Sequence, residues 1–555
     1  MSQRLLSLRL TGCLALLVCA TALGEPVSAD TPTAPHTNTS PTLPPELQDL
    51  DAYIERASRV LGMPGIAIAI VKDGKVVMEK GYGVRDIGKP AQVDAHTMFS
   101  IASNTKVFTA VALQMLAEQG KLDMDDRVID HLPWFRMSDP YVTKEMRIRD
   151  LLAHRSGLGP HAGDLLYFPA TSYTTKQVVE HLRYVPLVHS FRGAYDYDNI
   201  LFAVATLVIE QASGQSYADF VREHIFQPVG MDESLIDGTF LKPGANAAVG
   251  QEMVRGKLTA VPMLAWVNNR GAAGIYSNVH DMAKWMNVQL ADGLLPTMDG
   301  GKSQRLFSED SQRQMWSTIT PIDIDPPAVP ALAATTPNSL GYGEGWYLSD
   351  YRGQRLVWHT GGWPGMASEV MLVPALKLGV VILTNQESEE PFKAVIYQVL
   401  DAYLGAPKTH WIGAYAAAMK QGDSSDDVRW RAHLAARDPN SHPSLPLAGY
   451  AGDYCDAWYG DVSVRMEGGK LRLHFSKTPQ LIGTLEPWQH DTFLVHWDDS
   501  ALNASAFISF TLDADGKVRE ARMQRASSSV ASAYDFQDLR LEPVESGKSA
   551  GSGSK

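Results

Sequence analysis

The sequence predicts an α/β protein in which helices flank one sheet, followed by a separate antiparallel β domain. Within residues 1–404, strand-like segments lie near both ends with helical segments between them, which favours one sheet assembled from distant parts of the chain. After residue 447, apolar residues alternate with polar ones between glycine turns. This second pattern is typical of a small antiparallel barrel or sandwich.

The first elements follow from the spacing of the apolar residues. They recur at helical spacing over 46–61, which predicts a helix. The segment 65–83, GIAIAIVKDGKVVMEKGYG, predicts two strands joined by a turn at 72–75. An apolar helix is expected over 105–119, where Gly120 ends it.

The middle of the chain mixes helix and loop before strands return. The proline-rich stretch 320–337 predicts a surface loop. Further helices are expected over 199–212, 278–290 and 391–404. Further strands are expected over 345–362, 369–374 and 378–386.

Composition limits the function classes. The chain has 555 residues, of which 45% are hydrophobic, and this is ample for two or more domains. The net charge is −13 and the pI is near 5.7, with no basic cluster. This acidic balance argues against a nucleic-acid partner and against an anionic membrane surface.

The first 29 residues have the layout of a secretory signal peptide. Two arginines precede an apolar run over 13–23, and small residues then allow cleavage after Gly24 or Ala29. The run is short for a membrane span, so a membrane anchor is the less favoured alternative. A lipoprotein is less favoured still, because Cys13 precedes the apolar run. We therefore expect a periplasmic or secreted protein with no transmembrane span after cleavage.

Polar and low-complexity stretches separate the expected domains. They are a Thr/Pro-rich linker over 30–45, a partly helical connector over 405–447 and a flexible tail over 544–555. Cleavage of the signal would leave Cys455 as the only cysteine. No intramolecular disulfide is therefore expected.

Ser103 stands three residues before Lys106, where the apolar helix begins. A serine hydroxyl is a poor nucleophile at neutral pH unless a base or a loosely protonated lysine lies beside it. At this spacing both side chains lie on one face of a helix, near the positive end of its dipole. The pattern alone is weak, because it recurs at 552–555. Taken alone, Ser103 is better explained as a helix cap beside a solvated lysine.

Two further segments carry side chains suited to the same chemistry. Tyr197 and Asn199 come just before an expected helix, and His359 opens a His-Thr-Gly run at the end of an expected strand. Alone, each has an ordinary explanation as a core tyrosine, a helix cap or a structural histidine. Tyr195 is the rival to Tyr197 but lacks an asparagine two residues later.

Together with Ser103 and Lys106, these segments give Ser-x-x-Lys, Tyr-x-Asn and His-x-Gly in that order. The sequence thus resembles the serine β-lactamase-like family, which holds class C β-lactamases, D-Ala-D-Ala carboxypeptidases, D-aminopeptidases and related esterases. RDLLAHRSGL (149–158) and GIYSNVHDMAKWM (274–286) extend the likeness, which covers roughly 46–404. It implies the β-lactamase/transpeptidase-like fold of class α/β (α+β), an antiparallel sheet flanked by helices with an inserted helical subdomain.

The resemblance also implies roles for the motif residues. Ser103 would be the acylated nucleophile. Lys106 and Tyr197 would share the proton transfers, with the pKa of Tyr197 lowered by the neighbouring cation. Asn199 would orient Lys106 and the substrate amide. His359 would take the place of the third motif's cation and supply a positive or donor edge.

The third motif and the nucleophile would also hold the substrate. Backbone N–H groups of Ser103 and Gly362 would form the oxyanion hole. Thr360, Gly361 and Gly362 would line the substrate site, where glycine leaves room along the strand edge.

One departure from the family pattern guides the expected substrate. Most β-lactamases have a lysine, suited to a penicillin carboxylate, where this chain has His359. A histidine is often neutral at pH 7, so the motif resembles the peptidase and esterase branches. We expect an exported serine hydrolase that acts through an acyl-enzyme on D-residue peptides or small esters. The alternatives are a β-lactamase and a penicillin-binding sensor without turnover. Loops 159–173 and 320–337 are expected to set specificity.

No cofactor is expected, because the sequence has no metal-binding motif and no phosphate-binding glycine loop. The expected partner is a small-molecule or short-peptide substrate. The C-terminal β domain, expected over 448–543, resembles the module often appended to these hydrolases, through YAGDY (450–454) and LDADGKV (512–518). It would roof the active site, limit substrate size, mediate oligomers or only add stability.

Overall fold

The computed structural model describes residues 43–544, except 238–240, 243, 255–256, 262–266, 297–302, 439 and 528–529. The predicted signal peptide, most of the predicted linker and nearly all of the tail lie outside the described residues. All the described residues belong to one unit, 41–555. Among them, no helix combines the length and the apolar character that a bilayer span requires.

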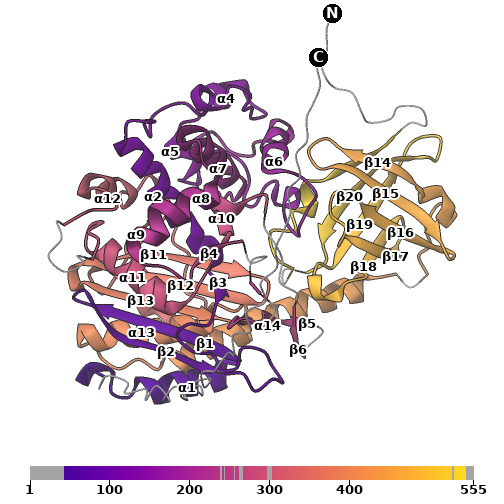
Figure 1. Cartoon of the computed structure of the whole chain (residues 1–555). Coiled ribbons are helices and arrows are strands. Elements are labelled where there is room, and N and C mark those ends of the chain that lie inside the picture. The colour runs from indigo at the N-terminus through magenta and orange to yellow at the C-terminus, as the bar shows by residue number, and fades with distance from the viewer. Residues whose placement is uncertain are drawn as a thin grey trace, which may run out of the picture. The chain divides into compact units, whose positions relative to one another are not determined.

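Eight antiparallel strands form the central sheet, in the order β2-β1-β13-β12-β11-β10-β9-β8 (Figure 1). The N-terminal hairpin pairs with β13, the last strand of this region, from Ile66 to Lys72 of β1. The predicted sheet of distant segments is therefore confirmed. The strands are β1 (Gly65–Lys72), β2 (Lys75–Gly83), β8 (Thr320–Pro321), β9 (Leu340–Tyr342), β10 (Tyr347–Tyr351), β11 (Gln354–Trp363), β12 (Met366–Val373) and β13 (Leu378–Thr384).

The sequence of the first hairpin explains its structure. The side chains of β1 alternate between two cores, so its three isoleucines join one core, and its alanines and Val71 join the other. The turn residues Asp73 and Gly74 have φ angles of 51° and 76°. Such left-handed angles at both central residues are what a two-residue hairpin of this type needs.

Helices cover both faces of the sheet (Figure 1). On one face lie α1 (Leu50–Leu61), α13 (Glu390–Leu404) and part of α14 (Trp411–Ala436). On the other lie α2 (Thr105–Glu118) and α11 (Val279–Leu290), where Phe108 stacks on Trp285 with ring centroids 4.0 Å apart. The expected helix 46–61 begins late, at Leu50, because a 3-10 turn, η1 (Pro45–Leu47), precedes it.

Between β2 and β8 the chain forms the predicted helical part, built around the buried α7 (Ile200–Ser213). Its other helices are α3 (Val128–His131), α4 (Pro140–Glu145), α5 (Ile148–Leu151), α6 (Thr175–His181), α8 (Tyr217–Val221), α9 (Gln227–Val229), α10 (Arg270–Ala273) and α12 (Glu309–Met315). Two small sheets join it, made of β3 (Phe99–Ser100), β4 (Leu235–Ile236) and β7 (Ile275–Ser277), and of β5 (Gln251–Val254) and β6 (Lys257–Ala260).

The stretch 320–337 is not wholly the predicted surface loop. It begins with the edge strand β8 and holds a 3-10 turn, η7 (Pro330–Thr335). Thr320 is buried and its hydroxyl donates to the carbonyl of Ala153. This contact with the helical part fixes the start of the segment and gives it strand structure despite its prolines.

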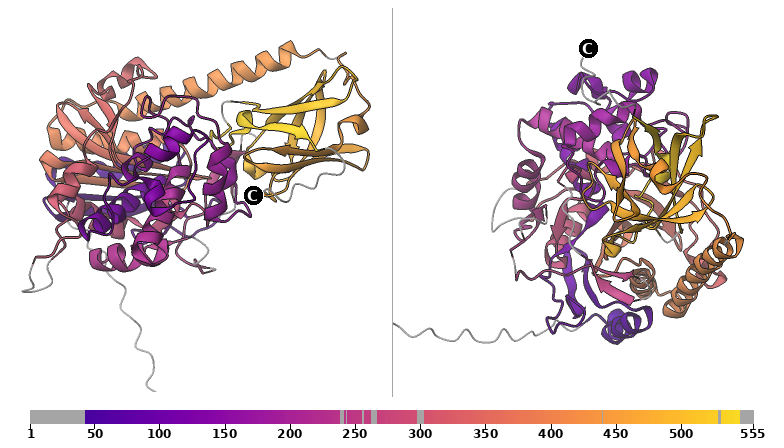
Figure 2. Two further views of the ribbon diagram at one scale, coloured as in Figure 1. Left: turned by 90° about the horizontal axis from the view of Figure 1, so that it is seen from above. Right: turned by 90° about the vertical axis from the view of Figure 1, so that its right-hand side faces the viewer.

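The C-terminal strands close into an eight-stranded antiparallel barrel, so the barrel alternative is confirmed over the sandwich. Aromatic side chains fill its interior, and its core is continuous with that of the helical part. Helix α14 extends from the sheet to the barrel (Figure 2). There Trp430 packs on Trp488. The strands are β14 (Gly452–Asp456), β15 (Gly460–Glu467), β16 (Lys470–Phe475), β17 (Ile482–Gln489), β18 (Thr492–Trp497), β19 (Ala506–Leu512), β20 (Val518–Arg525) and β21 (Arg540–Pro543).

Candidate active site

Ser103 lies in a 3-10 turn, η2 (Ala102–Asn104), that leads directly into α2. Ala102 before it has a φ of 46°, a left-handed angle that costs energy for any residue except glycine. The Lys106 ammonium Nζ lies 2.9 Å from Ser103 Oγ, as the spacing predicts. The helix-cap explanation is wrong, because Ser103 caps no helix and Lys106 is 0% exposed.

The buried Lys106 is held by three oxygen atoms. Besides Ser103, Nζ donates to Asn199 Oδ1 at 2.7 Å and to the carbonyl of Ala272 at 3.2 Å. Burial lowers the pKa of Lys106 from 10.5 to about 7, while the charge of Asp164 acts in the opposite direction. A substantial fraction of the lysine is therefore neutral at physiological pH, and a neutral amine accepts a proton.

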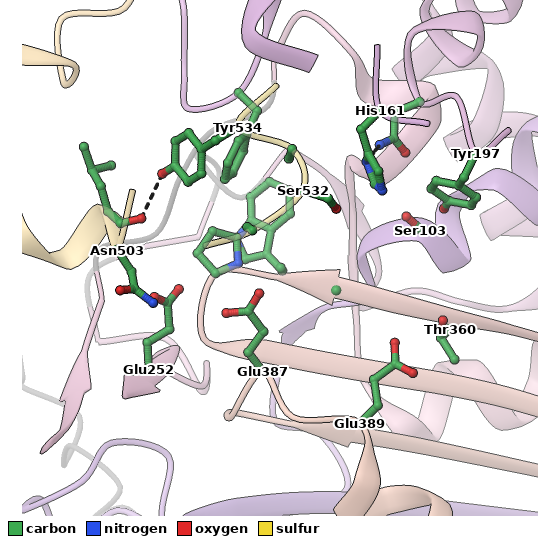
Figure 3. Close-up of a pocket in the computed structure, with 18 of the residues that line it drawn as sticks. Ser103, His161, Tyr197, Glu252, Thr360, Glu387, Glu389, Asn503, Ser532 and Tyr534 are labelled. Carbon is green, nitrogen blue, oxygen red and sulfur yellow. Dashed lines mark hydrogen bonds between the residues drawn. The ribbon is translucent and has the colours of Figure 1, made fainter. Parts of the chain in front are cut away.

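Tyr197 and Asn199 come from the loop before α7. Asn199 binds Lys106, and Tyr197 lies beside Ser103 (Figure 3). The Tyr197 side chain is hydrogen-bonded to that of Ser103. The expectation that a neighbouring cation lowers the pKa of Tyr197 is wrong. Removal from water raises that pKa well above its usual value and outweighs the Ser103 bond, so the phenol stays protonated. Tyr195 lies farther along the same wall, where its hydroxyl bonds to that of Tyr347.

His359 lies in β11 but behind the pocket wall. It is 1% exposed, and its Nε2 is 2.8 Å from the hydroxyl of Tyr342. Burial, aided by the charge of Lys106, lowers the pKa of His359 to about 3. The predicted positive edge is therefore wrong, because the imidazole is neutral at pH 7. Of the expected positive or donor edge, only an uncharged donor role for His359 remains.

Of the two β11 glycines that were expected to line the substrate site, Gly362 lines the pocket and Gly361 does not. Beyond Trp358, which pairs with the first residue of β10, this strand pairs only with β12 among the described strands. The Ser103 turn occupies the free side. A Cβ on Gly361 would lie 2.3 Å from the carbonyl oxygen of Ile101 and 3.0 Å from Ser103 N, whereas one on Gly362 would meet nothing. Gly361 is thus required by the nucleophile's turn, not by a substrate.

This difference gives a testable prediction. Gly361→Ala is expected to lower the free energy of unfolding by about 1–3 kcal/mol, because the added methyl overpacks the turn. Gly362→Ala, one residue later, is the matched control and is expected to leave stability within about 0.5 kcal/mol. Chemical denaturation measures both. Equal stability of the two variants would contradict the packing argument.

A cavity of about 540 Å³ opens above Ser103. His161, Tyr197, Asn199, Thr360 and Gly362 line it beside the serine. Of the two loops expected to set specificity, 159–173 contributes lining residues, and none comes from 320–337. The volume is in the range of sites for small molecules and short peptides.

Sequence reasoning missed most of the far wall of this cavity (Figure 3). One group is acidic, and the described lining holds no lysine or arginine against it. Another group comes from two loops of the barrel, between β18 and β19 and between β20 and β21. The acidic residues are Glu252, Glu387, Glu389 and Asp499, and the barrel residues are Asp499, Ala501, Leu502, Asn503, Ala531, Ser532, Ala533 and Tyr534.

Among the described residues, no three or more His, Cys, Asp or Glu side chains are grouped as a metal ion would require. The Ser103 site itself consists of an amine, a phenol, an amide and backbone groups. Its chemistry is therefore that of proton transfer and nucleophilic attack by a hydroxyl.

Comparison with known proteins places this geometry in a family. A family model described as beta-lactamase matches residues 50–404, and a domain of unknown function (DUF3471) matches 436–543. Unguisins hydrolase ungD from Aspergillus violaceofuscus is 29% identical over 461 residues, which cover 78% of each chain.

Two solved structures share the fold. An octameric penicillin-binding protein homologue from Pyrococcus abyssi aligns with a TM-score of 0.57 and 20% identity, over 89% of this chain and 99% of that one. A D-amino acid amidase from Ochrobactrum anthropi aligns with a TM-score of 0.51 and 23% identity, over 64% and 99%. Because the beta-lactamase model matches well over half of the sequence, this chain belongs to the beta-lactamase family.

Proposed function

We propose that this protein is a serine hydrolase that cleaves amide or ester bonds through an acyl-enzyme on Ser103. One observation carries the proposal: Lys106, buried and with its pKa lowered to about 7, lies 2.9 Å from the Ser103 hydroxyl. A neutral amine at that distance is within reach of the hydroxyl proton. The name of the relative, unguisins hydrolase, supports hydrolysis.

The side chains fit a two-step reaction. Lys106 takes the proton of Ser103 as Oγ attacks the substrate carbonyl, and the N–H groups of Ser103 and Gly362 stabilise the oxyanion. Tyr197 is protonated, so it can give its proton to the leaving amine or alcohol and take another from the Lys106 ammonium. The leaving group then departs, and the acyl group stays bonded to Ser103. Water then attacks the ester, Lys106 again takes a proton, and the acid leaves with Ser103 reprotonated.

The charge of the pocket favours some substrates. Its described lining has four carboxyl groups, no lysine and no arginine, and His359 is neutral and behind the wall. Glu389 is ion-paired with Lys393 at 2.8 Å, and burial raises the pKa of Glu252 to about 8 and that of Glu387 to about 7, so at neutral pH the wall carries only part of the charge of four carboxylates. A β-lactam antibiotic or a free C-terminal carboxylate would still find no lysine or arginine in the described lining to pair with. We therefore favour neutral or cationic substrates, such as D-residue peptides whose carboxylate is amidated or distant, and small esters.

A substrate panel tests this function. We expect steady turnover of p-nitrophenyl esters and D-aminoacyl amides, with kcat/KM for nitrocefin at least about 100-fold lower because the described lining offers its carboxylate no lysine or arginine. Initial rates for all three are measured side by side. A fluorophosphonate probe then reports whether Ser103 is acylated.

The panel also separates the alternatives. A stoichiometric burst without turnover would indicate a penicillin-binding sensor. Efficient nitrocefin hydrolysis would indicate a β-lactamase and would contradict the charge argument. Glu252→Gln with Glu387→Gln is the matched variant for that argument. Above about pH 8, where both carboxyl groups ionise in the wild type, it removes charge with little change in size and is expected to raise kcat/KM for nitrocefin relative to the ester.

We also propose that the protein is exported to the periplasm or secreted, on the sequence of residues 1–29. The proposal is independent of the site. N-terminal sequencing of the protein recovered from outside the cytoplasm tests it, and a chain that retains residue 1 in the cytoplasm would contradict it.

A further inference from the structure

Two loops of the barrel enter the pocket together. They are joined where the Tyr534 hydroxyl donates to the carbonyl of Leu502 at 2.9 Å (Figure 3). Ser532 and Asn503 line the cavity from these loops. The pocket wall is therefore incomplete without the barrel.

The residue after Tyr534 points in another direction. The Asp535 carboxylate is fully buried and accepts two backbone hydrogen bonds from the helical part. Gly163 N–H donates to Oδ2 at 2.7 Å, and Leu165 N–H donates to Oδ1 at 3.0 Å. These bonds join segments about 370 residues apart in the chain, and both carboxylate oxygens are used.

The loop held in this way, 161–166, in turn holds the Ser103 site. Asp164 lies between the two N–H donors, and its Oδ2 accepts from Asn199 Nδ2 at 3.0 Å. The opposite end of the same amide accepts from Lys106 at 2.7 Å. In addition, His161 N–H donates to the carbonyl of Tyr197 at 2.9 Å. One loop thus fixes both residues of the Tyr-x-Asn motif.

We propose that Asp535, on the barrel, is a positioning residue for the Ser103 site and acts through loop 161–166. The inference rests on the proposed function and deepens it, because it makes the barrel a working part of the site. The barrel and the helical part already share one apolar core. A buried carboxylate is costly, and here it lies close to Asp164, whose charge adds to that cost.

The consequence for Lys106 is electrostatic. Asp164 favours the protonated form of Lys106, against the effect of burial. If loop 161–166 loosens, that stabilisation weakens and the amine loses its proton at lower pH. The groups that face Lys106 from other elements are Asp164, Tyr197, His154 and His359, and those that face Asp535 are Asp164, Tyr167 and Asp538.

Kinetics of the full chain on a p-nitrophenyl ester test the proposal. Asp535→Ala is expected to lower kcat about 10-fold with a smaller change in KM, and to move the acid limb of the pH profile down by at least half a pH unit. Asp164→Asn is expected to move the limb in the same direction. Asp535→Asn keeps the size of the side chain and one of its two hydrogen-bond acceptors, so its effect on kcat and on the acid limb is expected to be smaller. If Asp535→Ala does not fold, this variant replaces it in the test.

Asp515→Ala is the matched control. It removes an exposed carboxylate of the barrel, in the turn between β19 and β20, and is expected to leave kcat and the acid limb unchanged. Wild-type kcat and an unshifted limb in folded Asp535 variants would overturn the proposal. So would an equal effect of Asp515→Ala.

The proposal and the proposed function fail in different ways. If the wild type turns over no ester, the function fails, and the titration of Lys106 still tests Asp535. In that case the free energy of unfolding is measured as a function of pH for four proteins: the wild type, Lys106→Met, Asp535→Ala and the double variant. The difference that Lys106→Met makes in each background reports the titration of Lys106. We expect the Lys106 titration to begin at lower pH with Asp535→Ala, and an unchanged titration overturns the proposal.

Discussion

Ser103→Ala is expected to abolish hydrolysis, with kcat falling by about 10⁴-fold or more, because no acyl-enzyme forms without the hydroxyl. The fold should survive. Lys106 keeps its bonds to Asn199 and Ala272, and Ser103 itself caps no helix. Ester turnover, fluorophosphonate labelling and thermal unfolding are measured on one preparation.

Ser552→Ala is the control for Ser103→Ala, because it removes the serine of the second Ser-x-x-Lys match, which lies outside the described residues. It is expected to leave turnover and labelling at wild-type levels. Undiminished hydrolysis in folded Ser103→Ala would place the nucleophile elsewhere. Labelling lost with turnover retained would indicate direct attack by water.

The predictable part of the site is the part set by local spacing. Ser103 and Lys106 meet because three residues along a helix start return a side chain to the same face. Tyr197 and Asn199 were placed through the family pattern, since no local rule brings residue 199 to residue 106. A single sheet built from distant segments followed similarly, because apolar strands at both ends of a region have few partners other than each other.

What the sequence did not predict depends on burial and on distant contacts. The motif predicts that a nearby cation lowers the pKa of Tyr197, but the loss of water around the phenol raises that pKa well above its usual value. His359 was given a positive edge because its motif position suggested one, yet it lies behind the wall. Both errors have one cause: a motif gives neighbours along the chain but not the depth at which they lie.

The contribution of the barrel was hidden for a similar reason. Asp535 meets Gly163 across about 370 residues of sequence, and no periodicity relates them. The only sequence signal is that 526–536, rich in alanine and serine, interrupts the strand alternation just before the last strand. Such an interruption marks a loop that departs from the barrel, and here the loop forms part of the pocket.

Lys106→Met is expected to lower kcat about 10³-fold, because it removes the proton acceptor while nearly keeping side-chain volume. In the wild type, the acid limb of kcat/KM should lie near pH 7, where Lys106 loses its proton. In Lys106→Met this limb should disappear from the residual rate. A pH–rate profile of each protein on a neutral ester measures both effects.

The same substitution has a stability signature with a definite sign. The folded-state pKa of Lys106, about 7, lies below its unfolded value, so between about pH 7 and 10 the unfolded chain binds more protons than the folded one. The free energy of unfolding of the wild type, relative to Lys106→Met, should therefore rise with pH by about 1.4 kcal/mol per unit across that window. Below pH 7 the difference should be flat. If the free energies of unfolding of the wild type and of Lys106→Met ran parallel at every pH, Lys106 would have an ordinary pKa. It would then be protonated at neutral pH and could not act as the base in the proposed mechanism.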